Sequence, residues 1–395
     1  MIRAKKIRYF IFLRDIFILS VSAFGGPQAH LALMFETMVN KRNYLTEDEL
    51  IELHALCQIL PGPTSTQTIT ALGFRIGGPN LAYLTLLVWM LPAVSIMIAA
   101  AIGISTLQEK SISIDFTKYI QPMAVGFVTY AAYKISVKVV HTRLAMGLMI
   151  IAAVVSYFIK NPFIFPVILL VSGSITALKY KAHPEEKDKK IEVDWRNFIL
   201  WAAVLAFFAI LGGITRERTV LLFENFYRNG SLIFGGGQVL IPLLYTEFVE
   251  FKDYLTSEEF LSGFGIVQAL PGPVFSFSAY IGSLAMRDLG IFWQVLGGLI
   301  AAAGIFLPGT FLIFFVIRFW EQLKKYRMVK ASLEGINAAS SGLVIAAAFL
   351  LFQPIENDAN VINITVLLGT FIVLMFTRIP APFIIVAGLI AGLIF

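Results

Sequence analysis

Two Pro-Gly-Pro triplets, at 61–63 and 271–273, are the residues of this chain best suited to binding a ligand. Proline removes a backbone donor and fixes φ, while glycine permits a sharp turn, so a helix cannot run through either triplet. A new helix can begin at the last proline of each triplet. Its first amides are free and lie at the positive end of the helix dipole, where anions bind. The spacing therefore predicts an anion site built without a charged side chain.

Polar residues accompany both triplets and extend this predicted site. Gln58 and Gln268 each precede a triplet by three residues, hydroxyl and amide side chains follow the first triplet at 64–67, and Ser276 follows the second. We expect these side chains and the amides of 64–66 and 274–276 to surround an oxyanion with neutral donors. The alternative is that the triplets only kink membrane helices, in which Pro and Gly are common.

Glycine-rich breaks precede both triplets and expose further backbone amides. The first is Gly25-Gly26-Pro27, and His30 just after it can hydrogen-bond a substrate, carry a proton or serve a structural role. The predicted substrate-binding residues are Gly25, Gly26, Pro27, Gln28, His30, Gln58, Pro61, Gly62, Pro63, Thr64, Ser65, Thr66, Gln67, Gly235, Gly236, Gly237, Gln238, Gln268, Pro271, Gly272, Pro273 and Ser276.

The two sets of motifs belong to an internal repeat. Residues 24–63 align with residues 234–273 at a constant offset of 210, without a gap, and 15 of the 40 positions are identical. The matches include a Tyr-Leu-Thr sequence in a polar loop as well as the triplets, which chance similarity between apolar segments does not explain. A site at equivalent places in both halves favours ligand binding over a simple kink, because interrupted segments in paired halves mark transporter sites.

Composition places these elements in a membrane. Hydrophobic residues make up 58% of the chain and charged residues 14%, against about 45–50% and about 25% in soluble domains. The mean hydropathy is +0.80. Many of the apolar residues form blocks near the length that a helix needs to cross a bilayer. These blocks are 81–105, 144–159, 162–178, 198–214, 291–317, 336–352, 361–376 and 380–395. The sequence thus predicts an all-α polytopic membrane protein.

Basic residues in equivalent loops indicate that the two halves are inverted. The loop 107–118 has two basic residues and its counterpart 318–330 has five, whereas 134–143 has three and its counterpart 353–360 has none. The positive-inside rule then places 134–143, the linker 179–190 and 318–330 in the cytoplasm, together with the N-terminus. The fold class is therefore two inverted homologous repeats with broken or re-entrant helices at the Gly-Gly and Pro-Gly-Pro motifs.

The number of membrane crossings stays open between two arrangements. The segments 8–40 and 53–76 either cross once each, giving thirteen spans, or re-enter as hairpins, giving nine. We favour hairpins, because the glycine and proline breaks divide each segment into pieces of about half a membrane. The expected domains are 1–178 as the first repeat, 179–218 as a linker with a connecting helix, and 219–395 as the inverted second repeat.

Other classes of function find little support in the sequence. The net charge of +6 arises from loop residues and does not indicate nucleic-acid binding. The single cysteine, Cys57, has no Cys or His cluster around it, so neither a disulfide nor a metal site is expected. We find no paired carboxylates, no nucleophile with its base and no Walker A motif, so neither an enzyme nor an ATP-driven pump is expected. No catalytic residue and no cofactor are predicted.

The sequence resembles the chromate transporter family in its long, two-domain form, and the resemblance covers nearly the whole chain. The motifs that carry it are Phe24-Gly25-Gly26-Pro27 with His30, Gln58-Ile59-Leu60-Pro61-Gly62-Pro63, Gly73 with Gly77-Gly78, Phe234-Gly235-Gly236-Gly237-Gln238, Gln268-Ala269-Leu270-Pro271-Gly272-Pro273 and Leu307-Pro308-Gly309. The resemblance implies a secondary transporter in the bacterial inner membrane that exports chromate, a sulfate-like dianion, from the cytoplasm.

Two alternatives within membrane transport stay open. The chain could carry sulfate or another small anion, or it could be a passive anion channel, since inverted repeats also occur in channels. The expected partners are membrane lipid and a small oxyanion such as chromate or sulfate, with a homodimer as an option and no nucleic acid.

Overall fold

The computed structural model describes residues 9–110, 117–159, 161–178, 194–234, 237, 239–320, 327–357, 361–377 and 379–394. Helices and short turns make up these residues, with no strand among them. The first half contains α1 (Tyr9–Ser22), α2 (Gly26–Met34), the π-helical η1 (Phe35–Lys41), α3 (Glu47–Ile59), α4 (Thr64–Glu109), α5 (Ile120–Val139), α6 (Arg143–Phe158) and α7 (Ile164–Ala177).

The helix α8 (Arg196–Thr215) connects the halves, as expected for the span near 198–214. The second half repeats the order with α9 (Arg218–Leu232), α10 (Leu240–Tyr245), the π-helical η4 (Thr246–Phe251), α11 (Ser257–Ala269), η5 (Val274–Ser276), α12 (Phe277–Leu284), η6 (Arg287–Leu289), α13 (Ile291–Val316), α15 (Arg327–Asn357), α16 (Val361–Phe376) and α17 (Ala381–Ile394).

Local details of the two halves coincide at the 210-residue offset. Thr46 and Thr256 each begin a helix with a capping box, in which the threonine pairs with Glu49 or Glu259. Just before these caps, Asn43 and Asp253 both have positive φ values, of 51° and 53°. Identical turn chemistry at matched positions confirms that the halves are structural repeats.

The segments around the breaks are short and pair as hairpins. The helices α1 and α3 have 14 and 13 residues, or about 20 Å, against the roughly 30 Å of a bilayer core. The helix α4 is also interrupted, because Gly77 and Gly78 are non-helical. A Cβ on Gly73 would lie 2.4 Å from Thr85 Oγ1, so the chain folds back at this break. Short, folded-back segments agree with hairpins rather than continuous spans.

The long part of α4 after Gly78 runs antiparallel to α13. Ser105 donates a hydrogen bond to Gln294 at 3.1 Å near one end of the pair, and the Tyr83 ring packs edge-on against Phe314 at a centroid distance of 5.4 Å near the other. The ends of the first-half hairpins that lie away from the Pro-Gly-Pro turn are near Phe314, because Phe74 stacks on Phe314 and the next residue, Arg75, pairs with Glu49. The corresponding ends in the second half are near Ser105, because Gln108 donates a hydrogen bond to Glu259. The two halves are therefore inverted with respect to each other.

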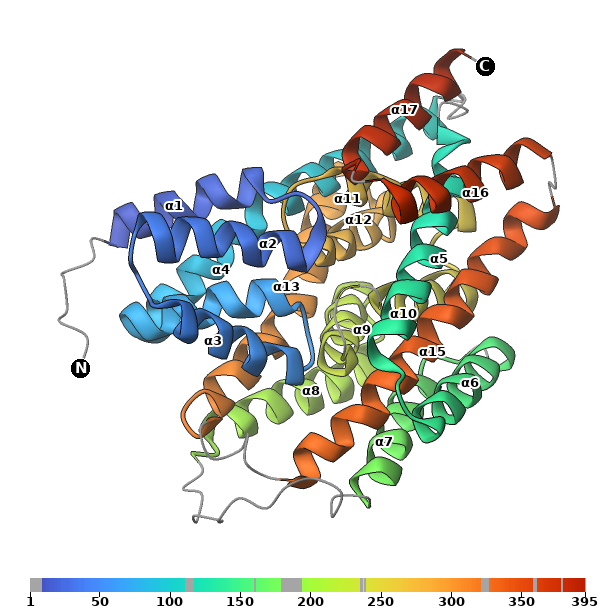
Figure 1. Cartoon of the computed structure of the whole chain (residues 1–395). Coiled ribbons are helices and arrows are strands. Elements are labelled where there is room, and N and C mark those ends of the chain that lie inside the picture. The colour runs from blue at the N-terminus through green and yellow to red at the C-terminus, as the bar shows by residue number, and fades with distance from the viewer. Residues whose placement is uncertain are drawn as a thin grey trace.

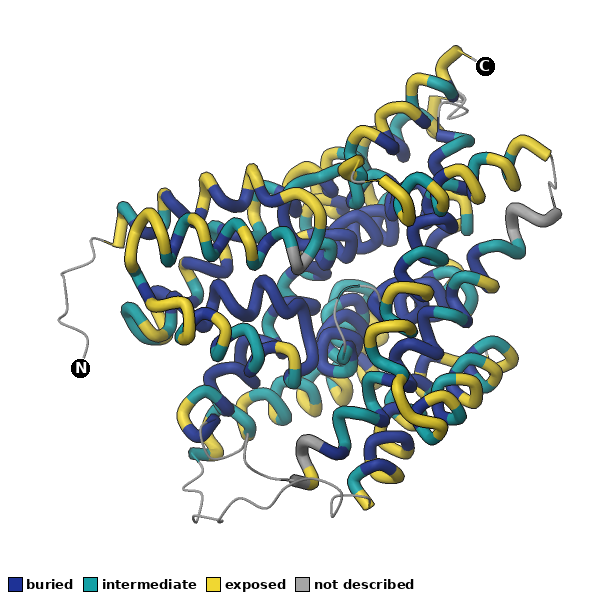
Figure 2. Tube along the Cα trace, viewed as in Figure 1, coloured by how far each residue is buried: buried dark blue, intermediate teal, exposed yellow. Residues whose placement is uncertain are grey.

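Two groups of helices surround the middle of the molecule. In Figure 1, α1 to α4 lie on one side, α5 to α7 and α15 to α17 on the other, and α9 to α13 between them. The helix α15 packs against α5, α6 and α7, so the second group joins both halves. Buried residues follow the centre, and exposed residues follow the outer faces of α1, α6, α16 and α17 (Figure 2).

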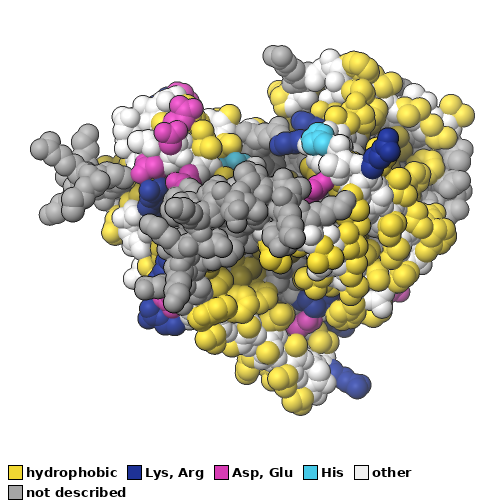
Figure 3. Space-filling view, turned by 60° about the horizontal axis from the view of Figure 1, so that its bottom comes forward, with side chains coloured by type: hydrophobic (Ala, Val, Ile, Leu, Met, Phe, Trp, Pro, Cys, Tyr) yellow, Lys and Arg dark blue, Asp and Glu magenta, His cyan; other side chains and the backbone are white. Residues whose placement is uncertain are grey.

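The outer surface is apolar, as a lipid-facing surface must be. Large hydrophobic side chains are exposed along the outer helices, including Ile151, Leu170 and Phe383, and such side chains cover much of the face shown in Figure 3. Four helices among the described residues are long and apolar enough to cross a membrane: Thr64–Glu109, Arg196–Thr215, Ile291–Val316 and Ala331–Gln353. The chain is an all-α polytopic membrane protein.

Candidate substrate site between the repeats

The tips of the hairpins meet across the boundary between the repeats. The Gly62 amide donates to the carbonyl oxygen of Ile233 at 2.7 Å, and the Gly272 amide donates to that of Ala23 at 2.9 Å. These two bonds are related by the 210-residue offset, so each Pro-Gly-Pro turn holds the glycine break of the other half. Both triplet glycines have positive φ, at 118° and 103°, as the sequence anticipates for a sharp turn.

The two long helices pack behind these tips in the same reciprocal way. A Cβ on Gly62 would lie 3.5 Å from Gly309, and one on Gly272 would lie 3.1 Å from the Cβ of Ala93. Ala93 follows Pro92 inside α4, and Gly309 follows Pro308 inside α13. The small residues after these prolines therefore let the turns pack closely against the two long helices, partway along each.

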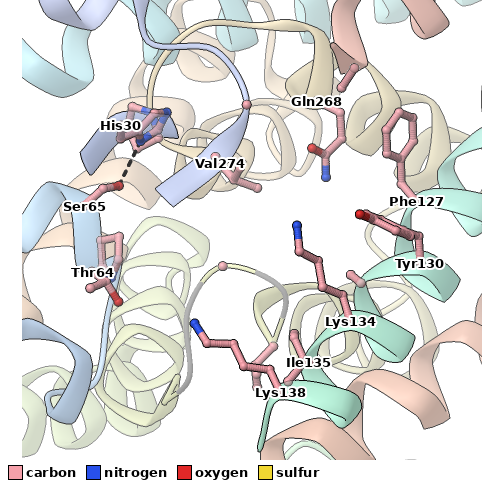
Figure 4. A pocket seen from close by; sticks show the side chains of 18 of the residues that line it. His30, Thr64, Ser65, Phe127, Tyr130, Lys134, Ile135, Lys138, Gln268 and Val274 are labelled. Carbon is pink, nitrogen blue, oxygen red and sulfur yellow. Dashed lines mark hydrogen bonds between the residues drawn. The ribbon is translucent and has the colours of Figure 1, made fainter. Parts of the chain in front are cut away.

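A cavity of about 570 Å³ opens beside the tips, between the two groups of helices (Figure 4). The predicted residues that line it are Gly25, Gly26, His30, Gln58, Pro63, Thr64, Ser65, Gly237, Gln268 and Pro273. The structure thus brings residues of both glycine breaks and of both Pro-Gly-Pro segments to one place. Other lining residues come from α5, from α15 and from residues 374–381.

His30 connects the tip of α1 to the start of α4. Its Nε2–H donates to the Ala23 carbonyl at 3.0 Å, because a carbonyl can only accept, and its Nδ1 lies 3.0 Å from Ser65 Oγ. In the neutral ring Nδ1 is then the acceptor, and the Ser65 hydroxyl donates to it. The ring also packs edge-on against Trp89. His30 is buried, and its hydrogen bond with Ser65 orients that side chain at the cavity wall.

Gln58 is held by a second chain of hydrogen bonds. Its amide donates to His54 Nε2 at 3.1 Å, and His54 Nδ1–H donates to Thr68 Oγ1 at 3.3 Å. The Thr68 hydroxyl in turn donates to the Thr64 carbonyl at 2.7 Å. The chain fixes the Gln58 carboxamide beside the first turn of α4. His54 was absent from the predicted site, although its place one helical turn before Gln58 is a signal in the sequence.

Three predicted side chains, those of Thr66, Gln67 and Ser276, lie outside the cavity and are buried in the protein. Gln67 donates to the Pro61 carbonyl at 2.6 Å, and Thr66 accepts a hydrogen bond from Trp89 Nε1 at 3.0 Å. Ser276 is fully buried, and its amide donates to the Pro273 carbonyl at 2.9 Å. The structure therefore removes the Ser276 amide from the expected set of free donors.

The remaining predicted residues are accounted for as follows. Pro61, Gly62, Pro271 and Gly272 form the turns and do not line the cavity. Pro27 and Gln28 belong to α2, with side chains outside the described part, and Gly235, Gly236 and Gln238 also lie outside the described residues. Arg75, which lies between the first triplet and the Gly77-Gly78 break, pairs with Glu49 at 3.1 Å and does not line the cavity.

Two lysines lie at the cavity, and not in a loop as the sequence predicts. Residues 134–143 were expected to form a loop, but α5 continues to Val139, and Lys134 and Lys138 line the cavity. Loop assignment rested on charge alone, whereas a four-residue spacing within an apolar segment signals one face of a helix. No carboxylate occurs among the described residues that line the cavity.

The apolar helices and the cavity between two inverted repeats are typical of a membrane transport protein. A sequence model of the family described as Chromate transporter matches residues 10–177 and 220–393. The chain belongs to the chromate transporter family.

Named relatives support this assignment over nearly the full length. A probable chromate transport protein of Synechococcus elongatus is 26% identical over 384 residues, which cover 95% of this chain and 93% of that protein. A chromate transport protein of Cupriavidus metallidurans is 22% identical over 382 residues, covering 95% and 90%. An uncharacterized transporter of Methanocaldococcus jannaschii is 24% identical over 334 residues, covering 83% and 80%. No solved structure matches the chain.

Proposed function

We propose that this protein is a secondary transporter that exports chromate or a related small oxyanion from the cytoplasm. The observation that carries the proposal is the cavity at the repeat boundary, which is lined by donors from both Pro-Gly-Pro segments and by two lysines, with no carboxylate among the described lining residues. The names of the relatives from Synechococcus and Cupriavidus support chromate as the substrate. Sulfate has the same shape and charge, so it is the main competitor.

The oxyanion binds between the two turns in this proposal. A bare dianion in an apolar environment is very costly, so it needs several donors at once. Gln58 and Gln268 offer carboxamides from the two halves, and Thr64 offers a hydroxyl beside the first amides of α4. Ser65, whose hydroxyl proton is donated to His30, contributes its backbone amide. The α4 dipole adds a favourable term of about 0.3–2 kcal/mol.

The proposal extends to the arrangement in the cell. We place the chain in the bacterial inner membrane with the N-terminus, residues 140–143 after the end of α5, 179–190 and 318–330 on the cytoplasmic side. Residues 1–178 and 219–395 act as the two repeats, joined by the linker and helix of 179–218. Of these loops, 179–190 lies outside the described residues, and 318–330 is described only in part.

Transport by everted membrane vesicles tests the function. Vesicles that contain the protein should accumulate labelled chromate, with sulfate as competitor, above vesicles from cells with an empty vector. Preloading with unlabelled chromate should accelerate uptake of the label, because a carrier exchanges substrate across the membrane. Flux that follows voltage without such counterflow would instead identify a channel. Absence of chromate and sulfate uptake at normal expression would refute the proposed function.

A further inference from the structure

Lys134 and Lys138 face the cavity from the helix opposite the Pro-Gly-Pro turns. They are one helical turn apart on α5, and both amines point into the cavity in Figure 4. Lys134 Nζ lies 5.5 Å from the ring centroid of Tyr130, which also lines the cavity. Neither lysine forms a salt bridge within the described part of the chain. Two uncompensated cations therefore lie beside the candidate site.

The matching helix of the other half carries no such cations. The segment 331–353 of α15 contains neither lysine nor arginine, and it contributes Asn337 and Ser340 to the cavity. The positive charge therefore comes from one repeat only, although the turns come from both. The duplication of the two halves therefore does not account for the positive charge that Lys134 and Lys138 bring to the cavity.

Ser340 supplies an independent sign that the cavity takes a polar ligand. The side chain is 2% exposed and lines the cavity. Its hydroxyl has no hydrogen-bond partner among the described residues. Buried polar groups are normally hydrogen-bonded, so an unpaired hydroxyl facing a cavity calls for a ligand or water there.

We propose that Lys134 and Lys138 select the charge of the substrate, favouring a doubly negative oxyanion over a singly negative one of similar size. The inference rests on the proposed function. The attraction between a lysine and an anion is proportional to the charge of the anion, so each lysine favours a dianion twice as strongly. In this account the hydroxyls and carboxamides beside the turns select the size and shape of the oxyanion, and the two lysines select its charge.

Binding to protein reconstituted in nanodiscs tests this role. Labelled sulfate is the probe, with chromate as a doubly charged competitor and perchlorate as a singly charged tetrahedral one. We compare Lys134→Gln and Lys138→Gln with Lys134→Arg and Lys138→Arg, which keep the charge. Lys118→Gln is the matched control, because Lys118 also lies over a tyrosine ring, at 5.2 Å from that of Tyr119, but outside the cavity.

Each glutamine variant should lose about tenfold in affinity for sulfate and chromate and only about threefold for perchlorate. The arginine variants should lose far less, and Lys118→Gln should bind as the original protein does. A glutamine variant that keeps the full preference for dianions would overturn the inference. If Gln58→Leu abolished binding in that case, the proposed function would stand without it. If the unaltered protein bound neither sulfate nor chromate, both proposals would fall.

Discussion

The amide of Gly62 and the carbonyl of Ile233, which lie in different repeats, are joined by a hydrogen bond of 2.7 Å. Its equivalent joins Gly272 to Ala23, so the contact is reciprocal, as in a two-fold symmetric interface. The carbonyl of Ala23 also accepts the bond from His30. The wall of the cavity and the contact between the repeats therefore share one backbone atom.

The turn glycines should be essential for stability. Gly62→Ala places a side chain at a φ of 118°, with its Cβ 2.7 Å from Gln67 Nε2, so the variant should lose about 2 kcal/mol or more. The matched control is Gly103→Ala, because Gly103 lies inside α4 and a Cβ there meets nothing within 4 Å. Thermal unfolding in detergent should show a clearly lower melting temperature for Gly62→Ala alone. Equal melting temperatures would contradict the role of the turn.

Side chains at the cavity should affect affinity without affecting folding. Gln58→Leu and Gln268→Leu each remove a donor to a charged ligand, which should cost about 1.5–3 kcal/mol, or roughly ten- to hundredfold in affinity. Ser65→Ala should weaken affinity too, since it also removes the partner of His30. Transport affinity and membrane abundance are measured together. Unchanged affinity in all three variants at normal abundance would place the site elsewhere.

Replacement of Thr66 should reduce stability and leave substrate affinity unchanged. Its hydroxyl accepts the bond from the buried Trp89 Nε1 and lies outside the cavity. Thr66→Val should therefore leave the indole unpaired and cost about 1–3 kcal/mol of stability. The protein that remains folded should keep its substrate affinity. An affinity loss like that of Gln58→Leu, with an unchanged melting temperature, would mean that Thr66 contacts the substrate.

A buried charge cluster in the second half should contribute to stability. Arg228 donates to both carboxylate oxygens of Glu247 at 3.1 Å and to Glu224 at 3.0 Å. Glu247→Leu should cost about 3 kcal/mol, because it leaves Arg228 buried with one partner fewer. Adding Arg228→Leu should recover part of this loss. The exposed Arg196→Leu is the control and should change the melting temperature little. A double variant at least as unstable as the sum of the single ones would refute this coupling.

The inverted topology in the membrane can be tested by labelling single cysteines introduced into a Cys57→Ser background. Residues 318–330 should be reached from the cytoplasmic side, and residues 107–118 from the opposite side. The reason is the reciprocal distribution of basic residues in equivalent loops. Labelling of both loops from one side would contradict the orientation. Cys57 itself is fully buried, so its replacement needs a check of abundance.

The repeat and its broken helices could be predicted from the sequence because their causes are local. Proline and glycine act on their own backbone. Thr46 and Thr256 are each followed three residues later by a glutamate, which is the sequence pattern of a capping box at a helix start. Gln58 and Gln268 are candidates for a common site for the same local reason, and both line the cavity. The repeated local motifs therefore predicted the cavity wall that the two Pro-Gly-Pro segments and the glycine breaks form.

The other half of the cavity could not be predicted, because distant helices supply it. Nothing near Lys134 in the sequence indicates that α5 packs opposite the turns, and its charge resembled that of a loop. Thr66 and Gln67 lie outside the cavity for a related reason, since their directions depend on Trp89 and Pro61. Neighbours on a single turn of α4 face different surroundings, and only packing decides which of them reaches the cavity.

The position of bound chromate tests the central claim most directly. Crystals grown with chromate should show a chromium peak in an anomalous difference map, lying between the carboxamides of Gln58 and Gln268 and next to the first turn of α4. The peak should disappear in the double variant Gln58→Leu/Gln268→Leu under the same conditions. A peak at another position, or no peak in the unaltered protein at saturating chromate, would contradict a substrate site between the two Pro-Gly-Pro turns.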